Sequence, residues 1–336
     1  MKQYKLLEGD AKDVLNQFED NTFHCCITSP PYWQQRDYFV NGQLGNEETP
    51  DEYISKLVEV FNEVKRVLRK DGILWIVIGD TYKKSGMKIN IRNKNIIGIP
   101  WKLAFALQEN DWIIRTEVIN NKTNVIPDGA RDRPTHSHDY IFMCTKSPKY
   151  FYDYYSSLED SESQIDTIQR FGAKNQKGTF RHDQERTFEH YGKRNRRSVW
   201  TTSVANFKGS HFAVFNPELI EPALKASIST KGYCPQCKSP WKRILEKVKT
   251  PANNAKGYNL ELITREWQPT CKCGIEEKEV GLILDPFCGT STTGLVAFKY
   301  NMDYVGIDIN KDYLEISKSR LKEDDIFVNI GDTYND

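Results

Sequence analysis

The sequence has no long apolar run and almost no excess of charge. Its longest uninterrupted apolar stretch, Ile73 to Ile78, is far shorter than the ~18 residues that a membrane-spanning helix needs, so we expect no membrane span. The 336 residues carry 47 Lys and Arg against 46 Asp and Glu, so affinity for an acidic partner has to come from local clusters of charge. The N-terminus also lacks the apolar segment of a secretion signal, and we therefore expect a cytoplasmic protein.

Cysteine is present, but in a pattern that does not favour disulfides. Without an export signal, the eight cysteines are expected to be thiols or metal ligands. Two pairs, Cys234 with Cys237 and Cys271 with Cys273, resemble the ligand set of a zinc ribbon, in which four thiolates hold a structural Zn²⁺. Because the second pair is Cys-x-Cys and not the more usual Cys-x2-Cys, free thiols remain the alternative. A catalytic zinc is not expected, since four thiolates leave no open position.

Strand-like and helix-like segments alternate at both ends of the chain. Apolar residues between 51 and 72 recur at three- and four-residue steps, which predicts an amphipathic helix, and the apolar run 73–78 predicts a buried parallel strand. Further strands are expected at 4–7, 23–28, 112–119, 140–145, 281–284 and 304–308, and helices at 11–18, 101–109, 217–227, 292–300 and 313–322. This alternation predicts an α/β fold with a doubly wound sheet that is assembled from both ends of the chain.

A small-residue loop near the C-terminus has the pattern of a nucleoside-binding turn. Asp285 ends an apolar strand, and Pro286-Phe287-Cys288-Gly289-Thr290 leads into the next helix. Gly289 lets the backbone approach a ligand, and free N–H groups at the helix start suit a carboxylate or phosphate. Asp308, 19 residues after Gly289, stands where a carboxylate accepts the ribose hydroxyls. The alternative is an ordinary strand-to-helix turn; a P-loop is excluded because no Gly-Lys-Ser/Thr follows.

A second loop, Ser29-Pro30-Pro31-Tyr32, directly follows the expected strand 23–28. Two consecutive prolines stiffen the loop and remove two N–H donors, so it offers carbonyl and hydroxyl oxygens that suit an amino group. Tyr32 adds a planar face on which a nucleobase could stack. As an isolated string, these four residues are more often a plain turn than a site.

Together the two loops resemble the β-class amino-methyltransferases of DNA. The resemblance is carried by Thr28 to Trp33 and by Asp285 to Gly289, in the permuted order in which the catalytic motif precedes the cofactor motif. Further segments that look like the family are 99–104, 131–135 and 211–215. The resemblance implies a permuted, Rossmann-like methyltransferase sheet, S-adenosylmethionine as the methyl donor and double-stranded DNA as the substrate.

The resemblance also implies roles for individual residues. The catalytic loop would be Ser29, Pro30, Pro31 and Tyr32, with the Ser29 hydroxyl and the Pro30 carbonyl accepting hydrogen bonds from the target amine and Tyr32 stacking on a flipped base. Phe215 would pack near the methionine end of the cofactor. The full set of cofactor-binding residues would be Asp10, Phe215, Asp285, Phe287, Gly289, Thr290, Thr292 and Asp308.

The serine in the first motif position resembles the cytosine-N4 branch of the family, so we expect methyl transfer to cytosine N4. Methylation of cytosine C5 would need a Pro-Cys nucleophile, and none of the 14 prolines precedes a cysteine; Cys25 and Cys26 are expected to be core residues. Adenine N6 remains the alternative target, with RNA methylation a weaker one. From another class, the chain could be a non-catalytic zinc-ribbon DNA-binding protein.

Three positions depart from the family pattern. Ser291 stands where many members have a second glycine, which could alter cofactor affinity. Asn120-Asn121-Lys122 lacks the tryptophan often found before the lysine, and His138-Asp139 replaces His-Glu. None of these changes removes a group that the chemistry requires.

Two basic segments are candidates for contact with DNA. Residues 170–197 hold nine Lys and Arg against three acids, with aromatic residues between them, and this segment is expected to recognise the target sequence. The second segment follows the strand 73–78. The candidate DNA-binding residues are Lys83, Lys84, Arg181, Arg186, Arg194, Arg196 and Arg197. In general such charge runs are more often solvated loops.

We therefore expect five regions along the chain. They are a catalytic half of the core (1–154), a target-recognition insertion (155–200), a return to the core (201–230), a zinc-ribbon-like insert (231–280) and the cofactor-binding half of the core (281–336). The expected function is that of a site-specific methyltransferase of a restriction-modification system, with a restriction endonuclease as its functional partner.

Overall fold

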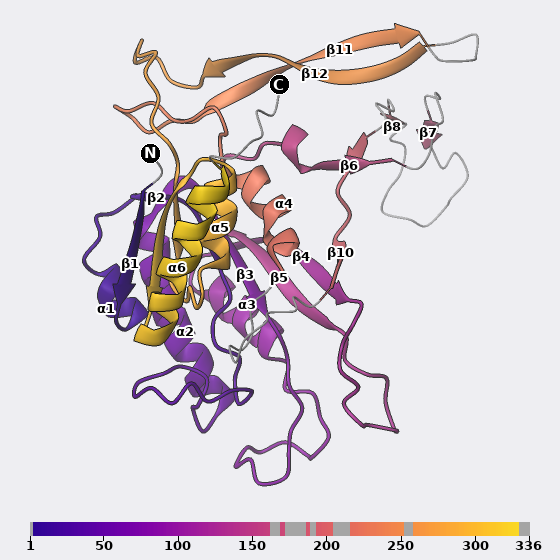
Figure 1. Cartoon of the computed structure of the whole chain (residues 1–336). Helices are drawn as coiled ribbons and strands as arrows, with labels where there is room; N and C mark the ends of the chain where they lie inside the picture. The colour runs from indigo at the N-terminus through magenta and orange to yellow at the C-terminus, as the bar shows by residue number, and fades with distance from the viewer. Residues whose placement is uncertain are drawn as a thin grey trace.

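The computed structural model describes residues 3–161, 169–171, 186–188, 193–203, 216–251 and 258–328. Its centre is an eight-stranded sheet in the order β1-β14-β13-β2-β3-β5-β4-β10 (Figure 1). These strands are β1 (Tyr4–Glu8), β14 (Asp303–Asp308), β13 (Leu282–Asp285), β2 (Phe23–Thr28), β3 (Leu68–Ile78), β5 (His138–Thr145), β4 (Ile113–Lys122) and β10 (Val199–Thr202). All neighbouring pairs are parallel except those that β5 makes with β3 and β4.

Helices cover both faces of this sheet, as the alternating pattern predicts. One face carries α1 (Ala11–Leu15), α2 (Pro50–Val67) and α3 (Ile99–Glu109), and the other carries α4 (Pro217–Ser227), α5 (Thr292–Lys299) and α6 (Lys311–Val328). Successive residues of β3 alternate between the two hydrophobic cores: Leu74 and Ile76 pack with the first set of helices, and Ile73 and Trp75 with the second. The doubly wound α/β fold is therefore confirmed.

The chain reverses its direction of progress across the sheet between β13 and β2. From β13 the chain continues to its neighbour β14 on one side, beyond which lies β1, and from β2 the chain continues to its neighbour β3 on the other side. Cys25 and Cys26 of β2 lie opposite Ile283 and Leu284 of β13, and both cysteines are fully buried, as expected of core residues. In open α/β sheets, ligands bind beyond the carboxyl ends of the strands at such a switch point.

Several elements differ from the expectations. α2 ends at Val67, short of the expected Gly72, because Leu68 is already extended, and β3 starts there. The cysteine insert contains a long antiparallel hairpin, β11 (Trp241–Pro251) with β12 (Tyr258–Pro269), which we call the arm. β10 crosses the expected boundary at residue 200 and pairs with β4 as an edge strand.

The expected target-recognition insertion contains only short elements among its described residues. They are η1 (Tyr155–Ser157), β6 (Leu158–Asp160), β7 (Gln169–Phe171), β8 (Arg186–Phe188) and β9 (Lys193–Asn195), with β6 paired to β9 and β7 to β8.

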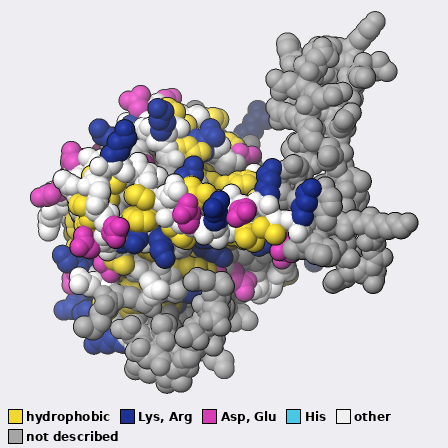
Figure 2. Space-filling model, turned by 90° about the horizontal axis from the view of Figure 1, so that it is seen from above, with side chains coloured by type: hydrophobic (Ala, Val, Ile, Leu, Met, Phe, Trp, Pro, Cys, Tyr) yellow, Lys and Arg dark blue, Asp and Glu magenta, His cyan; other side chains and the backbone are white. Residues whose placement is uncertain are grey.

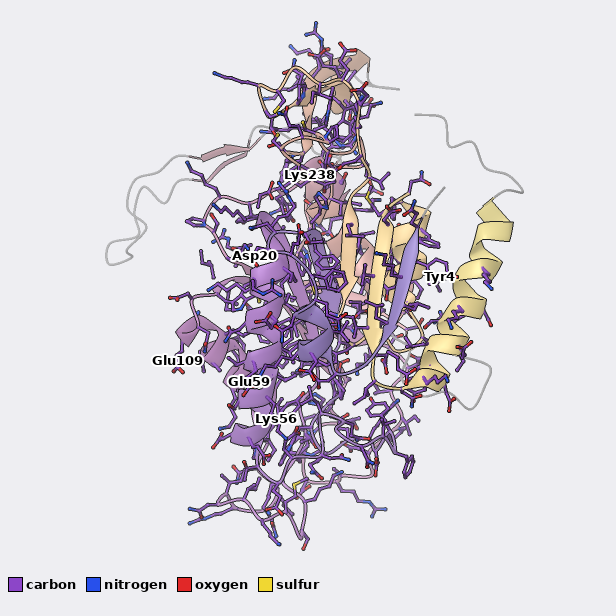
Figure 3. The ribbon with its side chains drawn as sticks, turned by 90° about the vertical axis from the view of Figure 1, so that its left-hand side faces the viewer. Tyr4, Asp20, Lys56, Glu59, Glu109 and Lys238 are labelled. Atoms are coloured by element: carbon purple, nitrogen blue, oxygen red, sulfur yellow. The ribbon has the colours of Figure 1, made fainter. Side chains whose placement is uncertain are left out.

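The arm and the start of the insertion lie at the end of the sheet where the parallel strands begin. Phe151 N donates to Asp71 O just before the buried part of β3, and Arg243 of the arm forms an ion pair of 2.8 Å with Asp153. Figure 1 shows the arm crossing this end, and Figure 3 shows Lys238 there, with Lys56 toward the opposite end. Seen from above, basic and acidic side chains are interspersed on the described surface of this end (Figure 2).

Among the residues that the structure describes, we found no helix with the length and hydrophobicity of a membrane span.

Candidate functional site

A pocket of about 310 Å³ lies beyond the carboxyl ends of the strands at the switch point. Its lining includes both loops that the sequence singles out, although they are more than 250 positions apart. From the first loop come Ser29, Pro30, Pro31 and Tyr32; from the second loop and its neighbours come Phe287, Gly289, Thr290, Thr292, Asp308 and Asp10. The two loops therefore share one pocket.

The first loop is held rigidly by residues that follow it. Trp33 is buried, and its indole N–H donates to the carbonyl of Glu47 (2.9 Å). The Tyr53 hydroxyl of α2 donates to the Pro31 carbonyl (2.6 Å). A carboxylate oxygen of Glu47 accepts the N–H of Gly45, whose carbonyl in turn accepts the N–H of Gln34. These bonds fix the loop where prolines supply no donors of their own.

The second loop turns sharply between β13 and α5. Gly289 has φ +51°, and its N–H donates to Asp308 Oδ2 (2.8 Å), while Asp308 Oδ1 accepts the N–H of Asn310 (2.8 Å). A methyl group added at Gly289 would meet no protein atom within 4 Å, so the loop leaves open space there beside the pocket. Ser291 has φ +59°, a backbone conformation that favours glycine.

Asp285 lies beneath the pocket and is not among its lining residues. Its carboxylate accepts hydrogen bonds from the hydroxyls of Thr28 and Thr293, both at 2.7 Å, and from the N–H of Phe287. Burial raises the pKa of Asp285 to about 6, although these hydrogen bonds act against the shift. Asp285 thus joins β2, β13 and α5 under the site.

Five further residues that sequence reasoning did not assign to the site come from the sheet. Val77, Asn120, Lys122, Asp139 and Thr202 line the pocket beside Tyr32. Lys122 Nζ forms an ion pair of 2.7 Å with Asp139 Oδ2, and the Thr202 hydroxyl donates to Asn120 Oδ1 (2.8 Å). Burial and the nearby Asp139 raise the pKa of the Tyr32 hydroxyl. The sequence places Lys122 three residues after the expected strand 112–119 and Asp139 one residue before the expected strand 140–145, and the structure extends both strands to include them.

The candidate DNA-binding residues are divided between the two ends of the molecule. Lys84 is exposed on the loop 79–98, which leaves β3 on the pocket side, whereas Lys83 is buried and donates to the Met87 carbonyl. Arg194 and Arg196 both contact the carboxylate of Glu159, at 2.9 and 3.9 Å, on the side where the insertion begins. Arg197 is exposed next to β10.

Three residues that the sequence predicts for the site have side chains outside the part of the chain that the structure describes. Phe215 and Arg181 lie outside the described residues, and Arg186 lies in β8 where only the backbone is described.

The four cysteines of the insert come together. The Sγ atoms of Cys234, Cys237, Cys271 and Cys273 all lie within 4.8 Å of one another. Hydrogen bonding with Ser239 lowers the pKa of Cys237 to about 6, and the hydrogen bond with Cys237 raises the pKa of Cys273 to about 12. Tyr233, next to the first pair, packs its ring against that of His24 at the start of β2, with the ring centroids 3.9 Å apart and the planes tilted by 45°. This cluster therefore lies at the end of the sheet away from the pocket.

Comparisons with known proteins agree with this geometry. The family model described as DNA methylase matches residues 23–234 and 274–319. The type II methyltransferase M.Cfr9I of Citrobacter freundii is 33% identical over 96% of this chain and 89% of its own length. The type II methyltransferase M.SmaI of Serratia marcescens is 32% identical over 96% of this chain and 91% of its own length.

Solved structures show the same fold at low sequence identity. The PvuII DNA methyltransferase (cytosine-N4-specific) has a TM-score of 0.59 at 13% identity and covers 98% of this chain and 92% of its own. TTHA0409 of Thermus thermophilus, complexed with S-adenosyl-L-methionine, has a TM-score of 0.54 at 19% identity, with 96% and 95% covered. With a model match over most of its length and two relatives above 30% identity, the chain belongs to the DNA methylase family, as a β-class amino-methyltransferase.

Proposed function

We propose that this DNA methyltransferase moves a methyl group from S-adenosylmethionine to the N4 amine of cytosine in double-stranded DNA. The observation that carries the proposal is the single pocket lined by Ser29 and Tyr32 on one side and by Gly289 and Asp308 on the other. One wall offers oxygen acceptors for an amine, and the other has the shape and charge for a nucleoside.

The chemistry assigned to the first loop follows from its atoms. The lone pair of the cytosine amine is delocalised into the ring, so the enzyme has to make it available for attack. The Ser29 hydroxyl and the Pro30 carbonyl would accept the two N–H groups of the amine and favour a tetrahedral nitrogen. Because Trp33 and Tyr53 fix this loop, little reorganisation is needed when the base arrives. Tyr32 would stack on the base after it leaves the duplex.

The residues of the second loop suit S-adenosylmethionine, which supplies an activated methyl group when bound. Each carboxylate oxygen of Asp308 accepts one backbone N–H. A carboxylate oxygen can accept a second hydrogen bond, so Asp308 can also accept hydrogen bonds from the ribose hydroxyls. The open space at Gly289 leaves room for the ligand against the backbone. Asp10, Phe287, Thr290 and Thr292 complete the proposed cofactor wall, with Asp285 acting from below.

The choice of cytosine over adenine is supported by Ser29 and by the cytosine-N4 specificity of the PvuII enzyme, which shares the fold. Both target amines need similar oxygen acceptors, so adenine N6 is the second candidate.

The loop 79–98 on the pocket side is the favoured DNA-contacting surface. Its exposed cations include Lys84, Lys88 and Arg92, and its Lys94 forms an ion pair of 2.5 Å with Asp132 of the neighbouring loop 123–137. Arg133 of that neighbouring loop stacks on Tyr82, 3.9 Å from the ring centroid. Cations on the side of the sheet that holds the pocket can neutralise phosphates of bound DNA. Of the basic segment 170–197, Arg194 and Arg196, which contact Glu159 where the insertion begins, would contact DNA farther from the pocket.

The cysteine cluster would hold a structural Zn²⁺. Four thiolates are a typical tetrahedral zinc set with Zn–S bonds of about 2.3 Å, which requires sulfur atoms about 3.8 Å apart. The observed spread of up to 4.8 Å needs only a small closure to reach this geometry. Pairing with a restriction endonuclease and a cytoplasmic location are proposed from the names of the type II relatives.

The test is to incubate the purified protein with S-adenosylmethionine and unmethylated DNA, then to digest the DNA and identify the modified nucleoside. N4-methylcytosine is the expected product, and sequencing of the same DNA gives the methylated site. N6-methyladenine as the sole product would overturn the choice of base. Ser29→Ala should reduce the rate at least 100-fold while S-adenosylmethionine still binds.

A further inference from the structure

Lys122 and Asp139 form an ion pair inside the pocket that the transfer chemistry described above does not use. The Lys122 side chain is 26% exposed and that of Asp139 12%, and their charged atoms are 2.7 Å apart. Removing a charged pair from water in a partly buried pocket costs free energy. Its presence beside the reactive loop therefore suggests that the pair has a function in the reaction. Both residues line the same pocket as Ser29 and Tyr32.

The sheet aims both side chains at the space next to Tyr32. Asn120 of β4 lies opposite Asp139 of β5, and Lys122 is two residues farther along β4, so the three side chains share one face of the sheet. An added methyl group at Gly79 would lie 2.6 Å from Tyr32 Cε2 and 3.0 Å from Asp139 Oδ1. The tyrosine ring and the carboxylate therefore both reach the space above this glycine.

The ion pair orients Lys122 without exhausting its donors. An ammonium group has three N–H donors, and the Asp139 carboxylate takes one of them. The remaining donors can be directed into the pocket. Asp139 thus acts as a positioning residue, and Lys122 presents a donor to whatever stacks on Tyr32.

Cytosine and adenine differ at the place that such a donor would read. When their amines are superposed, cytosine N3 and adenine N1 are both acceptors beside the amine. The next ring position is a carbonyl, O2, in cytosine but a C–H in adenine. A donor fixed opposite this position gains a hydrogen bond from cytosine and is left unpaired by adenine. Unpaired buried donors discriminate strongly between substrates.

We propose that Lys122, held by Asp139, donates a hydrogen bond to O2 of the flipped cytosine and so makes the pocket selective for cytosine over adenine. This inference rests on the proposed function, because it assigns the base specificity of the same pocket. The loop that binds the amine follows β2, whereas the two residues that would distinguish the bases, Lys122 and Asp139, lie on β4 and β5.

The experiment uses the full-length protein and two duplexes that carry its methylated sequence, one with cytosine and one with adenine at the target position. The values of kcat/KM for both duplexes are measured for the wild type and for Lys122→Met, together with the dissociation constant of S-adenosylmethionine. Lys299→Met is the matched control, since Lys299 also pairs with a carboxylate, Glu221 at 3.0 Å, but is not among the pocket residues.

Lys122→Met is expected to lower the cytosine-to-adenine ratio of kcat/KM by 10- to 100-fold, with cofactor binding within twofold of the wild type. Lys122→Arg should recover part of the ratio, and Asp139→Asn should lower it by less than Lys122→Met does. If Lys122→Met does not fold, the cytosine-to-adenine ratios of Lys122→Arg and Asp139→Asn test the inference in its place. The control should leave both values unchanged.

An unchanged ratio in Lys122→Met would overturn the inference. So would a cofactor affinity that falls in parallel with the rate, because the ammonium would then serve the methionine carboxylate. If the wild type prefers the adenine duplex, the proposed cytosine-N4 function itself is wrong. This outcome is distinct from an unchanged ratio in Lys122→Met, which overturns only the inference about Lys122.

Discussion

Thr28 and Asp285 are 257 positions apart in the sequence and are joined by a buried hydrogen bond of 2.7 Å. Thr28 ends β2 just before the Ser-Pro-Pro-Tyr loop, and Asp285 ends β13 just before the glycine loop. One bond thus connects the strand that carries the reactive loop to the strand that carries the cofactor loop, directly under the pocket.

Replacing Thr28 should weaken this connection. Thr28→Val keeps the side-chain volume but removes the donor, which leaves a buried carboxylate oxygen short of a partner, and we expect a loss of about 1–3 kcal/mol in the free energy of unfolding. Thr28→Ser keeps the hydroxyl and should cost less. Urea denaturation of the three proteins measures the difference. Wild-type stability in Thr28→Val would contradict the role of this bond.

Asp285 makes stability depend on pH. Its pKa in the folded protein is about 6, against 3.8 ordinarily, so between pH 4 and 6 the folded state holds a proton that the unfolded state has released. The contribution of this group to stability therefore falls as pH rises, by roughly 3 kcal/mol in total, and the fall is complete above about pH 6.

The matched variant is Asp285→Asn, which does not titrate. Its stability relative to the wild type should improve steadily from pH 4 to pH 6.5 and then level off, as followed by urea denaturation at several pH values. A difference between the two proteins that stays constant across this range would contradict the assignment.

Gly289→Ala should weaken cofactor binding. Alanine is strained at φ +51°, and its methyl group would project into the open space beside the pocket. We expect the dissociation constant of S-adenosylmethionine to rise at least tenfold in a titration followed by calorimetry. Gly129→Ala is the control, because Gly129 also has a positive φ (+72°) with open space around it but does not line the pocket. Equal effects of both variants on binding would count against the proposed cofactor wall.

Tyr53→Phe should slow methyl transfer without changing cofactor affinity. The variant removes the hydrogen bond to the Pro31 carbonyl and lets the reactive loop move, and we expect kcat to fall by about 3- to 30-fold. Tyr4→Phe is the control and should not change kcat, because Tyr4 is the first residue of β1 and lies at the end of this strand away from the pocket (Figure 3). A wild-type kcat in Tyr53→Phe would show that the other bonds suffice to hold the loop.

The cysteine cluster should bind one Zn²⁺ per chain. Elemental analysis of protein purified without added chelator gives the zinc content, and the double variant Cys271→Ser/Cys273→Ser should lose the metal and have a lower Tm. Because the cluster lies at the opposite end of the sheet from the pocket, the S-adenosylmethionine affinity of this variant should stay within a few-fold of the wild type. Zinc-free protein that also fails to take up added zinc would contradict the site.

Local patterns in the sequence were sufficient for seven of the eight strands of the main sheet and for two of its loops, but they did not predict the edge strand β10. Apolar periodicity predicts α2 and β3, and the strings around Ser29 and Gly289 predict loops at the carboxyl ends of their strands. These features depend on neighbouring residues, which is why they can be predicted without coordinates. The arm was not predicted, because its strands are rich in charged residues and only the short stretch Tyr258 to Leu262 alternates between apolar and polar residues.

By itself, the sequence determined the alternation of strands and helices, the two loops with their chemical groups, and the two cysteine pairs. Only the tertiary structure decided that Lys122 pairs with Asp139 beside Tyr32, that Tyr53 and Glu47 hold the reactive loop, and that the cysteine cluster lies away from the pocket. The physical reason is strand register: which side chains share a face depends on pairings between distant segments, and no local pattern specifies those pairings.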